Sequence, residues 1–494
     1  MLHLHGDSNT AEPQHNMKFY AVGMLALLAA VQGTAQTTAV SWTAPLDCNA
    51  AGEGALRPRI AINGDGNPVV LWGDYSPNSN HVAVGNGAAF LSPVEVSAPG
   101  CVPAVADWMG SSIAAAGNTV WVVMKGTPEE SKPVYVRRSD DGGYTWGDTL
   151  RVEPYDGLVS RFPSIALDDP DAPLVQYMQF DSGYFGARQV VSHMMGGGFM
   201  SPVQVSTPFA PGDVCDCCPN QVVVQGSNVV ALYRNAGPNI RVMWGASSGD
   251  GGATFPVGTE IDTTGWPLNS CPSSGPDGYL DGDSLRYVWM SGANNGTKVY
   301  VGNALASDLS LGAQWNVHPG QMQMLQQNFP RIAGSGDTLG IVWQQSMGGQ
   351  HEILFSWSVT GPIGLSAPDT VNLDATGAQK TPDIAYADGA FHIVWSELAT
   401  GQVRYRKATL TNDVGVQAFT PEAMRIFPDP VSDHLFIEGI IVGLAEVVDL
   451  HGRVHLSVAL SASQLDVRAL APAPYLLRIT DASGQQRTAR FTKR

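Results

Sequence analysis

Six cysteines are the side chains of this sequence that could form covalent bonds or bind a soft metal: Cys48, Cys101, Cys215, Cys217, Cys218 and Cys271. Their number is even and the chain carries the export signal described below, so disulfides are the expected state. We predict a Cys48–Cys101 bridge and one or two bridges among the other four. The alternative is a soft metal ion held by the Cys-x-Cys-Cys run at residues 215–218 and the distant Cys271. Because no histidine lies near this run, we predict that no metal is bound.

Four arginines lie at comparable places in the chain. Arg59 and Arg331 each stand between a proline and an Ile-Ala pair, Arg161 precedes Phe-Pro, and Arg234 follows a tyrosine. A planar guanidinium binds a carboxylate through paired hydrogen bonds. If three of the four converge, they therefore form a site for an acidic ligand. The alternative for each one is an ordinary solvated side chain or one that caps a backbone carbonyl.

A repeated unit must position these residues. It consists of a proline, a short apolar strand, a Gly or Asp turn, and an apolar strand that ends in an aromatic residue. Clear copies span residues 58–72, 163–177, 219–233, 330–343 and 382–395, and weaker ones start at Pro103 and Pro272. Each unit adds a third and a fourth strand, for example residues 134–137 and 203–205.

Four short strands per unit, at a period of roughly 45–60 residues, predict an all-β fold with a six- or seven-bladed β-propeller. A single blade cannot bury both of its faces, so the units must stack in a ring. Residues 39–42 are expected to close that ring on the last blade. The alternative is a series of separate β-sandwiches. We place the propeller at residues 38–418.

Two short stretches share the pattern Ser-x-Asp-x-Gly-x-Thr-aromatic. The aspartate can accept local backbone N–H groups, and glycine can adopt the positive φ that a tight turn needs. The pattern resembles the Asp box of the sialidase superfamily, which marks a β-hairpin inside a propeller blade and is structural there. Its residues here are Ser139, Asp141, Gly143, Thr145 and Trp146, and then Ser248, Asp250, Gly252, Thr254 and Phe255.

The resemblance to sialidases implies an active site. Those enzymes bind the substrate carboxylate with three arginines and use a tyrosine nucleophile, a glutamate and an aspartate acid/base, a recognised exception among glycosidases. In this chain the candidates for substrate binding are Arg59, Arg161, Arg234 and Arg331, and those for catalysis are Asp74, Tyr233 and Glu397, with Tyr75 and Tyr177 as alternatives to Tyr233. They are expected at the end of the ring that holds the loops before strand one and after strand two. The Asp-box turns are expected at the opposite end.

A longer span resembles an exported bacterial branch of sialidase-like proteins. It runs from Cys215-Asp216-Cys217-Cys218-Pro219 to the Cys-Pro-x-Ser-Gly-Pro stretch at residues 271–276. The resemblance implies an exo-α-sialidase acting on terminal acidic sugars. The alternative is a non-catalytic propeller that binds glycan or protein at the cell surface. No cofactor is expected, with calcium at the Asp-Gly loop of residues 281–283 as the alternative.

The C-terminal part has a different character and resembles the sorting domain of type IX secretion substrates of Bacteroidetes-type bacteria. It contains Phe-Pro-Asp-Pro at residues 427–430, Asp-Leu-His-Gly-Arg at 449–453 and a basic tail. Asp429 replaces the usual Asn, and Ala473-Pro474 replaces a Gly. We predict a small antiparallel β-sandwich at residues 422–494 and the type IX machinery as a partner. The alternative is an adhesive β module.

The N-terminal part predicts export. Met17-Lys18 precedes an apolar run at residues 19–31 and small residues at Gly33 and Ala35, as in a secretory signal peptide. We assign residues 1–16 to an upstream extension and 17–35 to the signal peptide, with an N-terminal anchor as the alternative. The mature chain is then expected outside the cell or on its surface, without a membrane span. A net charge of −17 argues against nucleic acid as a partner.

Overall fold

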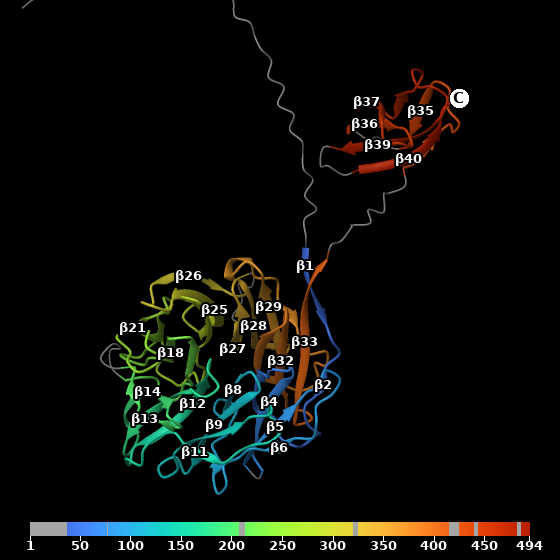
Figure 1. Ribbon diagram of the computed structural model, residues 1–494. Coiled ribbons are helices and arrows are strands. Elements are labelled where there is room, and N and C mark those ends of the chain that lie inside the picture. Colours follow the sequence, from blue (N-terminus) through green and yellow to red (C-terminus); the bar gives the residue numbers. More distant parts are fainter. Residues whose placement is uncertain are drawn as a thin grey trace, which may run out of the picture. The chain divides into compact units, whose positions relative to one another are not determined.

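The computed structural model of the chain describes residues 37–76, 78–206, 213–319, 325–413, 424–438, 443–481 and 486–494 (Figure 1). The chain divides into two compact units, of which Thr38–Thr411 is one and Asn412–Arg494 belongs to the other. The assignments to residues 1–16 and 17–35, and the boundary between 418 and 422, lie outside the described residues. Within those residues no helix is long and apolar enough to cross a bilayer.

The unit Thr38–Thr411 is a β-propeller whose described residues form seven blades of antiparallel strands (Figure 1). Adjacent innermost strands lie against one another all round the ring, and β31 contacts β3. The prediction of a six- or seven-bladed propeller is confirmed, with seven blades. The innermost strands are β3 (Leu56–Ile62), β8 (Ser112–Ala116), β12 (Val159–Ala166), β17 (Gln221–Gln225), β23 (Asp277–Asp281), β27 (Leu325–Ser335) and β31 (Gln379–Ala387).

The other strands follow outward in each blade. The second strands are β4 (Pro68–Asp74), β9 (Thr119–Thr127), β13 (Leu174–Asp181), β18 (Asn228–Arg234), β24 (Ser284–Ser291), β28 (Thr338–Met347) and β32 (Ala390–Glu397). The third are β5 (Ser79–Val84), β10 (Val134–Ser139), β14 (Phe185–Met195), β20 (Met243–Ser248), β25 (Gly296–Leu305), β29 (Gln350–Ser358) and β33 (Gln402–Asp413). The fourth are β6 (Val94–Glu95), β11 (Thr149–Arg151), β16 (Val203–Gln204), β21 (Val257–Glu260), β26 (Leu311–Asn316) and β30 (Asp369–Thr370), with β1 (Thr37–Trp42) in the last blade.

An aromatic residue toward the end of the second strand, present in six of the seven blades, explains why the blades stack. These side chains are almost completely buried in the apolar layers between blades, where they remove a large area from water. In the layer between the last and first blades, for example, Trp72 packs with Val70, Val394 and Tyr405. The aromatic positions of six blades are Trp72, Tyr177, Tyr233, Trp289, Trp343 and Trp395, each at most 1% exposed.

The N-terminal strands close the ring, as predicted. β1 pairs with the outer edge of β33 in the last blade. The short strand β2 (Leu46–Asp47) pairs with β33 as well, with Leu46 opposite Tyr405. Arg404 bridges Asp47 and Glu397 at 3.1 Å each, which ties β2 to the last blade. Strands from both ends of the propeller sequence thus complete one blade.

The two predicted turns have the hydrogen bonds that the pattern requires. The carboxylate of Asp250 accepts hydrogen bonds from the Ser248 hydroxyl at 2.7 Å and from the backbone and hydroxyl of Thr254 at 2.9 and 2.6 Å. Asp141 does the same with Ser139 and Thr145. Gly143 and Gly252 have φ values of +99° and +88°, which favour glycine. Both turns connect strands three and four of a blade.

The C-terminal unit is an antiparallel β-sandwich, as predicted. One sheet contains β34 (Ile426–Phe427), β35 (His434–Ile437) and β38 (Gln464–Asp466). The other has the order β37 (Val454–Leu460), β36 (Gly443–Val448), β39 (Pro474–Asp481), β40 (Gln486–Thr492). Alternate residues of both sheets build its own core, which includes Leu435, Val447, Leu477 and Phe491.

Candidate functional site

The innermost strands share a bulge just before the repeat proline. In four blades the residue before that proline has a positive φ, between 45° and 50°: Arg57, Phe162, Phe329 and Thr381. The register between strands one and two shifts at the same places. A positive φ is unfavourable for such residues, so the surrounding sheet must hold the bulge in place. The bulge sets the direction of the residue after the proline.

The residue after the proline at this place, with or without the bulge, belongs to what we call the polar belt. In the fifth blade that proline is Pro276 rather than Pro272. The members of the belt are Arg59, Ser164, Asn220, Asp277, Arg331 and Asp383. Asp383 of the last blade accepts the backbone N–H of Ile60 in the first blade at 2.9 Å. Asp277 accepts that of Ile332 in the next blade at 2.8 Å, and Ser164 accepts a hydrogen bond from Val222 at 3.2 Å. Each contact joins neighbouring blades. The belt is therefore first of all a set of ties between blades.

Arg331 is held by two carboxylates in this belt. It pairs with Asp383 at 2.6 Å and with Asp277 at 3.2 Å, and all three side chains are largely buried. Burial lowers the pKa of the Arg331 guanidinium, but the two carboxylates outweigh that effect and raise it. Arg331 is thus already bound to carboxylates of its own chain, which leaves little capacity for a substrate carboxylate.

Arg59 lies beside Arg331, and both line an axial cavity of about 270 Å³ that the innermost strands enclose. Arg59 is only 6% exposed and donates a hydrogen bond to the carbonyl of Pro58 at 2.7 Å. Burial and the neighbouring Arg331 lower its pKa to about 10. Above the belt a gap of only about 20 Å³ remains, lined by Trp108 and Arg57 among others. The two axial arginines lie side by side, but in a nearly closed space.

The other two predicted arginines lie elsewhere. Arg234 is 1% exposed and donates hydrogen bonds to the carbonyls of Ser274 at 3.1 Å and Met290 at 2.7 Å. Its role is to cap carbonyls between blades, so the prediction that it binds substrate is wrong. Arg161 is partly exposed and pairs with Glu129, and its guanidinium lies 4.6 Å from the ring centre of Tyr184. A convergence of all four arginines is not observed.

The three predicted catalytic residues do not face a common pocket. Tyr233 is fully buried, because it occupies the aromatic position that Trp72 has in the first blade, so a substrate cannot reach its hydroxyl. Glu397 is 4% exposed and pairs with Arg404. Asp74 accepts the backbone N–H of Ser76 at 3.1 Å in a turn. The predictions of a Tyr233 nucleophile and a Glu397 catalyst are therefore wrong, and Asp74 has a local turn contact.

An open pocket of about 440 Å³ lies at the end of the ring predicted to carry chemistry. Its walls are the loops after the second strands of the third and fourth blades and the loop before the fourth blade. Tyr184 and Phe185 supply rings, and Phe185 is 73% exposed. The polar groups are Asp213, Asp216, Asn239 and Arg241. This volume and this mixture of rings and polar groups are typical of small-ligand sites.

A tyrosine–glutamate pair borders this pocket. The Tyr184 hydroxyl donates a hydrogen bond to Glu130 and lies 3.5 Å from a carboxylate oxygen of Glu129. Burial and the bond to Glu130 raise the pKa of Tyr184 to about 12. Sequence reasoning missed this pair, because Tyr184 follows its strand in a turn with φ +66° rather than ending an apolar strand.

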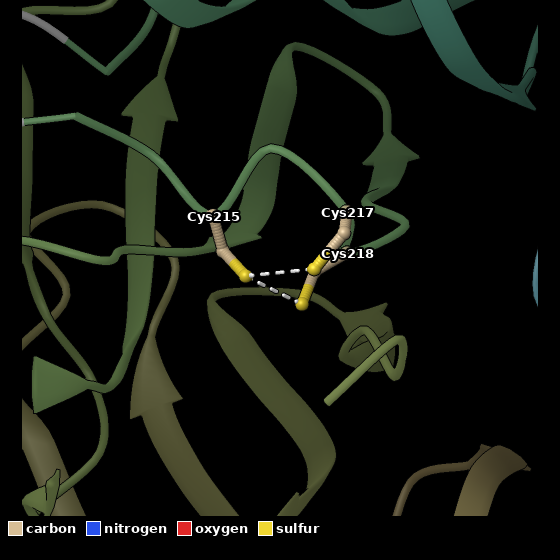
Figure 2. Close-up of side chains that lie close together, drawn as sticks. All are labelled: Cys215, Cys217 and Cys218. Atoms are coloured by element: carbon tan, nitrogen blue, oxygen red, sulfur yellow. Dashed lines mark hydrogen bonds between the residues drawn. The ribbon is translucent and has the colours of Figure 1, made fainter. Parts of the chain in front are cut away.

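The cysteines form one disulfide within the described residues, Cys217–Cys271. It agrees with the expected one or two bridges among the last four cysteines. Cys48 and Cys101 are separate buried thiols, each in a different apolar layer, so the predicted bridge between them is wrong. The Cys215 sulfur lies 2.8 Å from that of Cys218 (Figure 2).

Metal-binding atoms gather at one place in the described part of the chain. Cys215, Cys217 and Cys218 bring their sulfurs within 4.8 Å of one another. Since Cys217 is already oxidised to a disulfide, this set lacks the three thiolates that a soft ion needs. At the proposed calcium loop, both carboxylate oxygens of Asp283 accept hydrogen bonds from Ser307. Calcium there stays a prediction.

Comparisons with known proteins find similar folds among solved structures only. No family model and no curated protein matches it. Among solved structures, the GH93 α-L-arabinofuranosidase of Fusarium graminearum aligns over 74% of this chain and 98% of its own, with 13% identity and a TM-score of 0.40. The α-L-arabinanase of Penicillium chrysogenum aligns over 75% and 98%, with 9% identity and a TM-score of 0.43.

A third structure, PorZ of Porphyromonas gingivalis, is described as a surface component of the type IX secretion system. It aligns over 90% of this chain and 60% of its own, with 11% identity and a TM-score of 0.39. Likenesses this distant carry no argument about what the present chain binds or cleaves. The fold assignment rests on the strand topology, and any assignment of function must rest on the geometry of the pocket.

Proposed function

We propose that the protein is an exported propeller that binds glycan in the open pocket between its third and fourth blades. The observation that supports this most is the exposed ring of Phe185 beside Tyr184, opposite Asp213, Asp216 and Asn239. A flat ring packs against the C–H face of a sugar, while carboxylate and amide groups bind its hydroxyls. Arg241 adds a positive charge that suits an acidic sugar.

The experiment is a glycan array with the full mature chain, followed by titration of the retained glycans by calorimetry. We expect retention of a small set of glycans, with acidic sugars among them. A protein that retains none at millimolar monosaccharide or at array density contradicts glycan binding. A protein that retains only neutral glycans keeps the site but removes the acidic class.

The second candidate is a glycoside hydrolase, and the Tyr184–Glu130 hydrogen bond favours it. A tyrosine paired with a glutamate has the chemistry of the nucleophile in the sialidases that the sequence resembles. In this reading Glu130 takes the phenol proton, which is needed because the pKa of Tyr184 is about 12. The occupied state of Arg331 and the burial of Arg234 argue against a three-arginine carboxylate site, so we place hydrolysis second.

A fluorogenic sialoside distinguishes the two candidates. Binding without turnover is expected from the first proposal. Turnover that falls at least a hundredfold in Tyr184→Phe, with affinity retained, would assign hydrolysis to this pair. The matched control is Tyr155→Phe, an exposed tyrosine outside the pocket, which should leave any turnover unchanged.

We also propose that the C-terminal sandwich is a type IX sorting domain. It has its own core, and its last strand, β40, is followed by Lys493 and Arg494, the basic tail that the resemblance implies. Deleting residues 422–494 should leave a folded propeller in the periplasm. Normal amounts of the truncated protein outside the cell would contradict this role.

A further inference from the structure

Four cysteines lie together where the fourth and fifth blades begin. The disulfide Cys217–Cys271 joins the loops that precede the innermost strands of these two blades. Beside it lie the thiols of Cys215 and Cys218, each 1% exposed (Figure 2). The Cys215 sulfur is 3.6 Å from the Cys217 sulfur and 2.8 Å from the Cys218 sulfur. A dithiol therefore lies within contact distance of a formed disulfide.

The local backbone keeps the two thiols together. Cys218 donates its backbone N–H to the carbonyl of Cys215 at 3.2 Å, and Cys215 donates its own to the carbonyl of Arg234 at 2.9 Å. A hydrogen bond from the Cys218 thiol lowers the pKa of Cys215 to about 7, and the charges of Arg234 and Arg241 act in the same direction. Burial raises the pKa of Cys218. The pair is thus arranged as one thiolate and one thiol.

We propose that Cys215, Cys217, Cys218 and Cys271 form an intramolecular disulfide-exchange site. The Cys215 thiolate attacks the Cys217 sulfur, the Cys217–Cys271 bond breaks, and its electron pair leaves on Cys271. Cys271 is exposed and takes a proton from water. The attacking group must be a thiolate in contact with the disulfide, which the 3.6 Å separation provides.

The second step completes the exchange. The Cys218 thiol attacks the Cys215 sulfur of the new Cys215–Cys217 bond, and its proton passes to the Cys217 thiolate that leaves. The net change is Cys217–Cys271 plus two thiols to Cys215–Cys218 plus two thiols. One disulfide is broken for each one formed, so no external oxidant or reductant is needed.

The exchange has two consequences for the surface. It removes the covalent tie between the loops of the fourth and fifth blades. It also presents Cys271 as an exposed thiol, open to disulfides of other molecules. Neither consequence depends on glycan binding, although Asp213 and Asp216 of the pocket flank Cys215.

The test maps the bridges in the full mature chain, purified without reductant. Samples incubated from pH 5 to 9 are quenched in acid, alkylated, digested and analysed by mass spectrometry. We expect a mixture of Cys217–Cys271 and Cys215–Cys218 bridges. The rate of approach to that mixture should rise about tenfold per pH unit below pH 7 and level off above it, as the thiolate fraction does.

Variants isolate the two steps. Cys215→Ser should show only the Cys217–Cys271 bridge, and Cys218→Ser should accumulate the Cys215–Cys217 bridge. Cys48→Ser is the matched control and should exchange like the wild type. The proposal is overturned if wild-type protein keeps Cys217–Cys271 in every molecule at every pH. It is also overturned if both bridges are present in every molecule, or if a stoichiometric metal ion is found on the cysteines.

Discussion

The two ends of the propeller satisfy their polar groups in different ways. At the Asp-box end, the carboxylates of Asp141 and Asp250 bind groups within four residues of themselves. Toward the open end, Asp383 binds the backbone of Ile60, which is 323 residues away, and Arg234 binds the carbonyl of Ser274, 40 residues away. The hydrogen bonds at the Asp-box end form within single turns, whereas those toward the open end form only when blades pack against one another. Removing a polar side chain should therefore lower the free energy of unfolding more at the open end than at the Asp-box end.

The largest effect is expected at Arg331, in the polar belt. Arg331→Met keeps the volume but leaves Asp277 and Asp383 buried without their cation. Breaking a buried ion pair by removing one partner costs about 3–5 kcal/mol of the free energy of unfolding. Urea denaturation followed by tryptophan fluorescence measures it. The control is Arg286→Met, whose partner Asp337 is mostly exposed, and which should lose about 1 kcal/mol or less. Equal losses in the two variants would contradict the comparison.

A smaller effect is expected at the Asp-box end. Asp250→Ala removes the acceptor of the Ser248 and Thr254 hydrogen bonds, a loss of about 1–2 kcal/mol that resembles removal of a helix cap. Asp148→Ala, at an exposed position just after the first Asp box, should change stability by less than about 0.5 kcal/mol. The same denaturation experiment checks both. If Asp250→Ala lost as much as Arg331→Met, the turn could not be called a local structure.

A substitution in the open pocket should change the affinity for glycan without changing the stability of the fold. Phe185→Ala removes an exposed ring, so the free energy of unfolding should change by less than about 0.5 kcal/mol. Affinity for a glycan retained by the wild type should fall about tenfold, which calorimetry measures. Tyr144→Ala removes an exposed ring at the Asp-box end and should leave affinity unchanged. Loss of affinity in both variants would mean that the glycan binds elsewhere.

The smallest expected effect is a loss of stability at low pH. Hydrogen bonds from Thr254 and Ser248 lower the pKa of Asp250 to about 2. A carboxyl group whose pKa is lower in the folded than in the unfolded state stabilises the fold at pH values above its unfolded pKa, which is about 4. That stabilisation is lost as the pH falls toward 2. Between these values the wild type should lose slightly more stability than Asp250→Asn. Denaturation curves at pH 5, 4, 3 and 2 test this, and parallel losses in both proteins would contradict it.

The same contrast explains what the sequence could predict. The repeat of proline, apolar strand and aromatic residue has a local physical cause, so the blades, the closing strand and both Asp-box turns were predictable. Tyr233 and Arg234 were assigned to a site because they end a strand at the open end. For Tyr233 the correct signal was its equivalence to Trp72 and the other buried aromatic positions, which indicates packing.

The open pocket and the polar belt could not be predicted from any single stretch of the sequence, because each brings together residues from several blades. Tyr184 and Glu130 are 54 residues apart, and their meeting depends on how two loops of different blades approach each other. Most of the belt could have been found from the residue after the repeat proline, but the pairing of Arg331 with Asp277 and Asp383 joins residues of three blades that are far apart in the sequence. The Cys48–Cys101 prediction failed because the two thiols are buried in different apolar layers, whereas the loops before the fourth and fifth blades do bring Cys217 and Cys271 together.

The closure of the last blade has a consequence for how the chain folds. Thr43 and Arg406 are in contact although 363 residues separate them, so the final pairing joins two ends of a very long loop. Non-local pairing of this kind is slow, and until it forms the outer edge of β33 is an unpaired strand that other chains can join. Folding of the ring therefore finishes only after residue 413 has emerged, and aggregation competes with that last step.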